Sequence, residues 1–238
     1  MSNLRVLGVV TARGGSKGIP RKNVRDLCGR PLICHTIDTA NKSKLLSRSI
    51  ISTDDTEIAE IAKKCGGEVP FMRPKELAQD ESTSIEVIQN VIETLKKEGE
   101  KYDYVMILQP TSPLRTAEDI DGCIAVAQKT NADSVMSMKE ADDFSAKKMK
   151  KIVDGKIEPY FEDEGKESSR RQDLEKAYKR NCAIYLTKTN LILKGDLFGN
   201  NSQAYIMPEE RSVDINQPVD FELAEFWLKK NKEKNEKI

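Results

Sequence analysis

The chain has 238 residues, about a third of them charged, and its 39 basic and 39 acidic side chains balance to a net charge of zero. A general nucleic-acid binder is usually clearly basic, so this balance argues against a nucleic-acid partner. No apolar run approaches the roughly 18 residues that a membrane span needs, and the short N-terminal apolar run leads into a charged loop rather than a signal-peptide cleavage site. We therefore expect a single domain over residues 1–238 without a membrane partner.

The cysteines and the histidine limit the chemistry further. The five cysteines are odd in number, widely spaced and without a CxxC pair, so we interpret them as reduced, buried thiols of a cytoplasmic protein. His35 is the only histidine, which excludes a histidine-rich zinc site. Because it lies in an apolar helical segment, a structural role is favoured over catalysis. Any metal should be a hard ion such as Mg²⁺, held by carboxylates and phosphate oxygens.

Short β-rich runs alternate with amphipathic helical segments along the chain. The strand candidates are residues 5–12, 48–53, 104–109, 133–138 and 183–188. The helical candidates are residues 31–40, 83–95, 116–124 and 218–230. A capping box of Thr83 and Glu86 marks the start of the second helix, and Thr116 with Asp119 marks the third. The alternation predicts an α/β fold with a mainly parallel, doubly wound, Rossmann-like sheet, whose ligands bind beyond the carboxyl ends of the strands.

Residues 139–179 interrupt the alternation. This region is highly charged and poorly periodic. It is either a solvated surface excursion, which composition alone slightly favours, or an inserted arm used for dimerisation or for closing over a substrate.

The loop after the first strand, "TARGGSKGIPRKN" at residues 11–23, gathers basic side chains around glycines. Such a loop can present backbone N–H groups to phosphates, while Arg13 and Lys22 add charge. It matches neither the P-loop pattern nor the GxGxxG fingerprint. By itself it is as consistent with a tight turn as with a phosphate site.

Further motifs stand at later strand ends and near the C-terminus. They are "ISTDD" from residue 51, "RPKELAQDESTS" from 73, "LQPTSPLR" from 108 and "RSVDIN" from 211. Together with "ARGGSKGIPRKN", in this order and spacing, they resemble the acylneuraminate cytidylyltransferase family, the CMP-sialic acid synthetases, over nearly the whole chain. The resemblance implies transfer of CMP from CTP to the anomeric hydroxyl of a sialic-acid-like nine-carbon 2-keto sugar acid, with Mg²⁺ and release of pyrophosphate.

The resemblance also implies roles for individual residues. Arg13, Lys22 and Asp214 are the implied catalytic residues, and Asp214 and Asn216 are the implied metal ligands. The implied nucleotide-binding residues are Ala12, Arg13, Gly14, Ser16, Lys22, Asn23, Arg73, Ser82, Thr83 and Ser84. The implied sugar-binding residues are Gln109, Asn181, Tyr185, Lys179, Lys147 and Arg171. Helix capping is the alternative role for Thr83, and a core position in a strand is the alternative for Tyr185.

The sequence departs from the family pattern at three positions. Asn216 replaces the second aspartate of the metal motif, and an amide brings neither charge nor a base. Cys182 replaces a common glycine, and Lys179 replaces a common arginine, which removes a planar bidentate donor. The last two lie toward the sugar end, so they suggest a variant sugar acid rather than another reaction.

In the family, the excursion at residues 139–179 forms much of a homodimer and sends basic residues into the partner's sugar site. By position, Lys147 and Arg171 are the candidates. Two other functions remain open from the sequence. One is a nucleotidyltransferase of the same fold acting on a Kdo-like acid or a sugar phosphate, and the other is a non-catalytic nucleotide-binding module.

Overall fold

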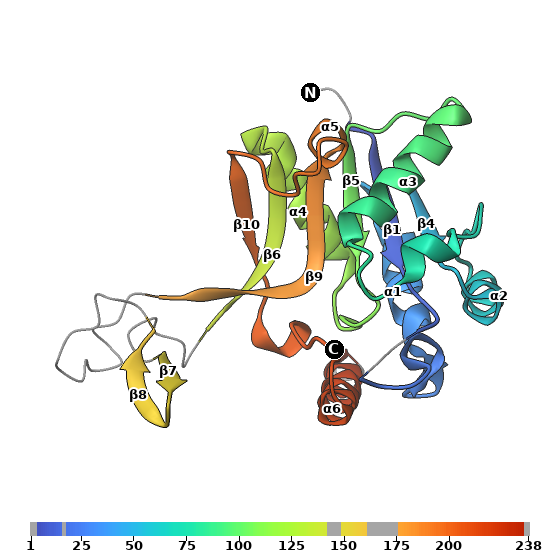
Figure 1. The fold of residues 1–238 in the computed structure, drawn as a ribbon. Coiled ribbons are helices and arrows are strands. Elements are labelled where there is room, and N and C mark those ends of the chain that lie inside the picture. The colour runs from blue at the N-terminus through green and yellow to red at the C-terminus, as the bar shows by residue number, and fades with distance from the viewer. Residues whose placement is uncertain (1–3, 16–17, 142–148, 161–175, 236–238) are drawn as a thin grey trace.

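The computed structural model describes residues 4–15, 18–141, 149–160 and 176–235 of the chain. Its centre is a six-stranded sheet in the order β10-β6-β9-β5-β1-β4 (Figure 1). The strands are β1 (Val6–Thr11), β4 (Arg48–Ser52), β5 (Tyr104–Leu108), β6 (Ser134–Glu140), β9 (Tyr178–Lys188) and β10 (Ser202–Ile206). Strand β9 runs antiparallel to β5 and β6, whereas the other paired strands are parallel. The predicted mainly parallel α/β sheet is confirmed.

Helices cover both faces of the sheet. They are α1 (Leu32–Lys42), α2 (Thr56–Lys64), α3 (Ser84–Lys97), α4 (Ala117–Thr130), α5 (Thr189–Ile192) and α6 (Pro218–Asn235). Side chains alternate along β1, so Val6 and Val10 pack with α1, α2 and α4, while Leu7 and Val9 pack with α3 and α5. A third apolar cluster joins α6 to the loop after β1 through Ile19 and Phe221.

The shorter elements lie mostly around the edges of the sheet. They are the 3₁₀ helices η1 (Lys22–Val24), η2 (Lys75–Ala78) and η5 (Glu209–Arg211), and the paired strands β2 (Asp26–Leu27), β3 (Arg30–Pro31), β7 (Lys150–Val153) and β8 (Lys156–Pro159). Both predicted capping boxes are present, at Thr83 and at Thr116. The capping alternative for Thr83 is therefore confirmed: its side-chain oxygen accepts a hydrogen bond from the Glu86 amide at 3.3 Å.

The excursion between β6 and β9 contains an antiparallel hairpin, β7–β8, that projects away from the sheet (Figure 1). Its turn is formed by Asp154 and Gly155, both with positive φ. An Asp-Gly pair is a strong hairpin signal, which sequence reasoning overlooked in this charged stretch. Residues 142–148 and 161–175, where Lys147 and Arg171 fall, lie outside the described residues.

The expectation that every cysteine is a reduced thiol is wrong for one pair. Cys34, on α1, and Cys65, directly after α2, form a disulfide with their Cα atoms 5.6 Å apart. The remaining cysteines, Cys28, Cys123 and Cys182, are free. The pair is separated by 31 residues, so no short motif marked it. Packing of α1 against α2 brings the two thiols together.

Reduction of this disulfide should lower stability. For a separation of 31 residues, the chain-entropy model gives a loss of about 4 kcal/mol in the free energy of unfolding. We expect dithiothreitol to shift the urea midpoint of the wild-type chain downward but to leave a Cys34→Ala/Cys65→Ala variant unchanged. Denatured, unreduced protein should show three reactive thiols. Five reactive thiols, or a midpoint indifferent to reductant, would disprove the pairing.

His35 has the structural role that its helix predicts. Its ring is half-buried on α1, and Nε2–H donates to the Leu27 carbonyl at 2.9 Å. Burial lowers the pKa of His35 below its ordinary value of 6.5, and Arg30 acts in the same direction. The hydrogen bond to Leu27 and the carboxylate of Asp38 oppose this shift without reversing it.

The lowered pKa predicts a pH dependence of stability. The unfolded chain takes up the proton more readily than the native one, so the stabilisation is present above pH 6.5 and is lost as the pH falls through the native pKa. Urea unfolding of wild type and His35→Gln should therefore diverge, with the wild type losing more stability between neutral pH and pH of about 5. Parallel pH profiles for the two proteins would contradict the shift.

Candidate active site

The polar loops that follow β1, β4 and β5 meet at one edge of the sheet, the carboxyl edge. Two polar hollows of about 290 and 280 Å³ lie there. Thr11, Arg13 and Gln109 line both hollows, so the two are adjoining halves of one cleft. This is where a doubly wound sheet places its ligand. The carboxyl edge is therefore the candidate active site.

The first hollow is bounded by residues of the loop before α3. Its other lining residues are Arg73, Leu77, Gln79, Asp80, Ser82, Ser84 and Val87. Arg73 is buried, and its Nε donates to Ser52 Oγ at 3.1 Å, which ties this loop to the end of β4. Burial lowers the pKa of Arg73, and the carboxylate of Asp54 opposes that shift. Three predicted nucleotide-binding residues, Arg73, Ser82 and Ser84, thus line one wall.

Arg13 reaches across the cleft to this wall. Its guanidinium forms an ion pair with Asp80 at 3.0 Å and donates to the Gln79 carbonyl at 3.3 Å. Both side chains are partly exposed, so the pair is weak and an entering phosphate can compete for the arginine. Sequence reasoning missed Asp80, although it lies inside the "RPKELAQDESTS" motif.

The second hollow lies beneath the glycine-rich loop. Gly18, Lys22, Asn23, Pro110, Thr111 and Asn216 complete its lining. The buried Asn23 donates to the Arg13 carbonyl at 3.0 Å and so fixes the curvature of the loop. A Cβ atom on Gly18 would lie 2.7 Å from the Asn216 carbonyl oxygen, so this position requires glycine.

Lys22 connects the loop to the C-terminal motif. Its Nζ donates to the Ile215 carbonyl at 2.8 Å. Burial lowers the pKa of Lys22, while the carboxylates of Asp214 and Asp220 act in the opposite direction. A half-buried ammonium in a polar hollow is suited to hold phosphate oxygens.

One carboxylate oxygen of Asp214 has no hydrogen-bond partner in the described part of the chain. Oδ2 accepts a hydrogen bond from Asn216 Nδ2 at 2.8 Å. Oδ1 is buried, and no described residue donates to it. A buried carboxylate oxygen is costly unless something pairs with it, so this atom marks a place for a cation or a donor group. Among the described residues no group of three or more histidine, cysteine or acidic side chains could enclose a metal.

Tyr185 feels the charge of this carboxylate and lies beside Cys182. Burial raises the pKa of Tyr185, and the Cys182 thiol and the Asp214 carboxylate act in the same direction. Tyr185 is half-buried on β9 and packs against the core on the α3 side of the sheet, as the alternative of a core strand position predicts. Its contact with a sugar stays a prediction. Cys182 has φ of 60°, a conformation that favours glycine.

Other predicted residues act through the backbone or in packing. The Ala12 amide donates to the Ser52 carbonyl at 3.0 Å, and the Gly14 amide donates to Asp54 Oδ1 at 3.2 Å. Asn181 is buried, and its amide contacts Ser137 and Ser212, so it ties β9 to β6 and to the segment after η5. Its contact with a sugar stays a prediction.

A few predicted residues are not brought into the cleft. Thr83 caps α3 and lines neither hollow, and Lys179 is exposed near the start of β9. Neither hollow is lined by Asn181, Tyr185 or Asp214, although Asp214 acts electrostatically on Lys22, which does line the second one. Ser16, Lys147 and Arg171 lie outside the described residues. Thr11 and Asp54 were missed by sequence reasoning, although both stand directly at strand ends, where the fold predicts ligand contacts.

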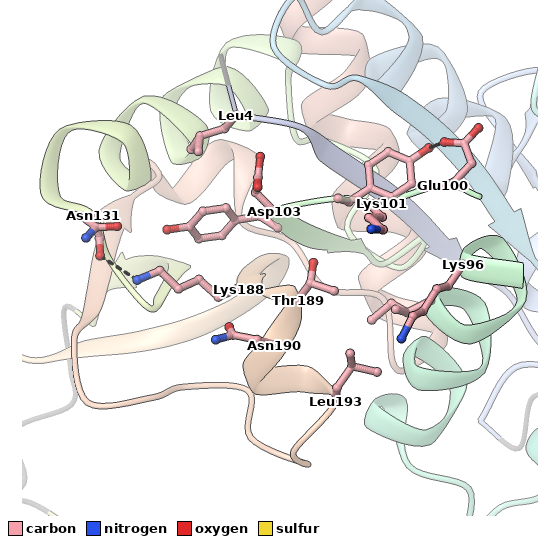
Figure 2. A pocket seen from close by; sticks show the side chains of 13 residues that line it. Leu4, Lys96, Glu100, Lys101, Asp103, Asn131, Lys188, Thr189, Asn190 and Leu193 are labelled. Atoms are coloured by element: carbon pink, nitrogen blue, oxygen red, sulfur yellow. Dashed lines mark hydrogen bonds between the residues drawn. The ribbon is translucent and has the colours of Figure 1, made fainter. Parts of the chain in front are cut away.

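A larger and mainly apolar hollow of about 510 Å³ lies at the opposite edge, where β5 begins (Figure 2). Leu4, Lys96 and Leu193 contribute to its walls, and Lys188 donates to the Asn131 carbonyl at 3.2 Å. It contains none of the predicted site residues. Despite its size, its accessible lining is mainly apolar and includes no residue of the sequence motifs, so we place the chemistry in the cleft.

Comparison with known families decides the class of protein. The family model described as cytidylyltransferase matches residues 7–230, nearly the whole chain. The chain belongs to the cytidylyltransferase family. It is therefore a nucleotidyltransferase, as the sequence motifs predicted.

The names of curated relatives of this cytidylyltransferase refer to related sugar acids. The chain is 34% identical to pseudaminic acid cytidylyltransferase of Campylobacter jejuni, over 97% of this chain and 99% of that protein. It is 31% identical to CMP-N,N'-diacetyllegionaminic acid synthase of Legionella pneumophila, over 97% and 99%. It is 30% identical to N-acylneuraminate cytidylyltransferase of Escherichia coli, over 97% of this chain but 54% of that protein.

Solved structures agree with the fold of this cytidylyltransferase. A CMP-2-keto-3-deoxy-manno-octonic acid synthetase complexed with CTP superposes with a TM-score of 0.71 at 15% identity, covering 95% of this chain and 99% of that one. The 4-diphosphocytidyl-2C-methyl-D-erythritol synthase of Anaerococcus prevotii gives 0.67 at 15% identity, covering 95% and 97%. At this identity the likeness establishes the shared sheet architecture.

Proposed function

We propose that this cytidylyltransferase transfers CMP from CTP to the anomeric hydroxyl of a sialic-acid-like nine-carbon 2-keto sugar acid, releasing pyrophosphate. The observation that carries the proposal is the two-part cleft at the carboxyl edge, in which Arg13, Lys22 and Gln109 meet beside Asp214. The relatives named for pseudaminic, legionaminic and N-acylneuraminic acids support the class of acceptor.

The nucleoside of CTP is assigned to the first hollow. Arg73, Ser82 and Ser84 line it, together with the Arg13 side chain at the boundary. The triphosphate then extends into the second hollow, where Lys22 and the glycine-rich backbone are available. Negative charge grows on the phosphoryl oxygens and on the departing pyrophosphate, so fixed cations such as Lys22 stabilise the transition state.

The residues present fit a divalent metal ion, which we take to be Mg²⁺. The buried, unpartnered Oδ1 of Asp214 would be its protein ligand, with phosphate oxygens and water supplying the rest, as is usual for this ion. Bound there, the ion would neutralise charge on the phosphates. Asn216, predicted as a second ligand, points its amide nitrogen at Asp214 instead.

The sugar acid is assigned to the side of the second hollow that faces β9. Gln109 follows β5, and Tyr185 pairs with Ile107 on the same strand, so the two flank one position at the end of β5. In-line transfer would then require the anomeric hydroxyl to approach the α-phosphate from the side opposite the leaving pyrophosphate.

We also propose that the chain, as a single domain over residues 1–238, acts as a homodimer in the cytoplasm, although the Cys34–Cys65 disulfide is unusual for that compartment. Ile152 on β7 pairs directly with Ile157 on β8, and they are 67% and 71% exposed. A two-stranded hairpin with an exposed apolar face has little stability by itself. We therefore propose that a second copy of the chain buries these two isoleucines. Ile152→Lys should then convert the dimer to a monomer in analytical ultracentrifugation. No helix of the described chain could span a membrane.

The substrate assignment is tested by pyrophosphate release with Mg²⁺. Each of CTP, UTP, ATP and GTP would be offered with pseudaminic, legionaminic, N-acetylneuraminic or Kdo acid. Release with CTP and a nine-carbon acid only is the expected result. Release with Kdo would favour the alternative acceptor class, and CTP binding without release for any acid would favour a non-catalytic nucleotide-binding module.

A further inference from the structure

The backbone around Asp214 is held from several sides. Lys22 Nζ donates to the Ile215 carbonyl at 2.8 Å, and the Ile215 amide donates to the Thr111 carbonyl at 2.8 Å. The Asn216 amide donates to Asp220 Oδ2 at 2.8 Å. The segment is therefore fixed between the glycine-rich loop, the loop after β5 and the start of α6. Side chains on so rigid a segment have few ways to rearrange.

Within this segment the two side chains at positions 214 and 216 contact each other. Asn216 Nδ2 lies 2.8 Å from Asp214 Oδ2 and 3.4 Å from the Asp214 carbonyl oxygen. Ionised carboxylate and carbonyl oxygens only accept hydrogen bonds, so the atom facing them must be the amide NH₂ group. The orientation of the Asn216 amide thus follows from its neighbours. The opposite carboxylate oxygen, Oδ1, is buried and has no partner among the residues that the structure describes.

We propose that Asn216 is a positioning residue for a single-carboxylate metal site and not itself a metal ligand. Its NH₂ group holds Oδ2, which turns the unpartnered Oδ1 of Asp214 into the one charged protein ligand for one divalent ion. The inference rests on the proposed function. An aspartate at 216 could not donate this bond, and it would set two carboxylate oxygens at the 2.8 Å separation now occupied by a hydrogen bond.

The position of the charge is what distinguishes positioning from ligation. If residues 214 and 216 shared the ion as ligands, one carboxylate and one amide would serve in either order. If Asn216 only orients Asp214, the charge must be at 214, because the buried Oδ1 belongs to that residue. Exchanging the two side chains keeps the composition and the net charge and separates these cases.

The experiment is a Mn²⁺ titration followed by water-proton relaxation, with inorganic pyrophosphate present to supply phosphate oxygens and with no CTP or sugar acid. The proteins are wild type, Asn216→Ala and the exchange variant Asp214→Asn/Asn216→Asp. We expect one Mn²⁺ per wild-type chain, about tenfold weaker binding by Asn216→Ala and about 10- to 100-fold weaker binding by the exchange variant. Thermal melting in EDTA identifies any variant that fails to fold. If Asn216→Ala does not fold, Asn216→Ser replaces it. The serine hydroxyl is a short donor, so Asn216→Ser should bind Mn²⁺ less tightly than wild type but more tightly than a variant without a donor.

Several outcomes would overturn the proposal. They are wild-type affinity in the exchange variant, unchanged affinity in Asn216→Ala, two Mn²⁺ ions per wild-type chain, or no binding by wild type. Since neither substrate is present, these outcomes are independent of the pyrophosphate panel. A chain that fails that panel while showing the expected Mn²⁺ pattern would refute the proposed function alone.

Discussion

Replacing Asp214 by alanine should lower kcat/KM for the cytidylyl transfer by about 1,000-fold, which corresponds to about 4 kcal/mol of transition-state stabilisation. Among the described residues, Asp214 supplies the only carboxylate oxygen that is both buried and unpartnered. Asp214→Asn, which has nearly the same shape, should lose a comparable amount because the loss comes from charge. Steady-state pyrophosphate release at saturating Mg²⁺ is the measurement.

Asp214→Ala should not lower the free energy of unfolding. Removing a buried oxygen that lacks a partner relieves a desolvation penalty, so the urea midpoint should stay the same or rise. Glu222→Ala serves as the control, because Glu222 is exposed on α6 and its removal changes the charge equally. Full turnover in Asp214→Asn would show that the charge at 214 is unnecessary, and a large drop in the midpoint would assign Asp214 a structural role.

Lys22→Met should lower kcat/KM by about 100- to 1,000-fold, the range found when one preorganised donor to a developing oxyanion is removed. The methylene stem keeps its packing, so the change removes the ammonium and its bond to the Ile215 carbonyl. KM for CTP should rise and kcat should fall, because the charge contacts phosphates both before and during transfer. Initial rates over a matrix of CTP and sugar-acid concentrations separate the two parameters.

The control for this prediction is Lys42→Met. Lys42 is exposed at the end of α1, remote from both hollows, and its loss changes the net charge by the same amount. We expect Lys42→Met to match the wild type within about twofold, an effect below 0.5 kcal/mol. If Lys22→Met and Lys42→Met behave alike, the ammonium of Lys22 has no part in the reaction.

The sequence predicted most of the central sheet because burial leaves a clear pattern in it. The continuous apolar run of β5 and the capping boxes of α3 and α4 placed these elements correctly. Strand β10 was not predicted: its burial alternates between exposed and half-buried, so it has no apolar face. The antiparallel direction of β9 was also beyond reach, since a strand's local pattern is the same in either direction.

For the site, the motifs predicted which residues lie near the carboxyl edge of the sheet, but not which atoms each side chain contacts. Arg13 and Lys22 were expected near phosphates, yet the Arg13–Asp80 pair and the Lys22–Ile215 contact arise only when distant loops meet. Asn216 was expected to be a weak metal ligand, and the structure directs its amide nitrogen toward Asp214. The Cys34–Cys65 disulfide was missed for the same reason, because it joins two helices that only the tertiary fold brings together.

The central claim is tested most directly by ³¹P NMR of CTP, Mg²⁺ and pseudaminic or legionaminic acid incubated with the wild-type chain. The proposed reaction predicts that the three CTP resonances give way to pyrophosphate and a single CMP phosphodiester in equal amounts, and that Asp214→Ala leaves CTP unchanged over the same time. Conversion of CTP to CDP and phosphate, or no conversion with either acid, would contradict the account.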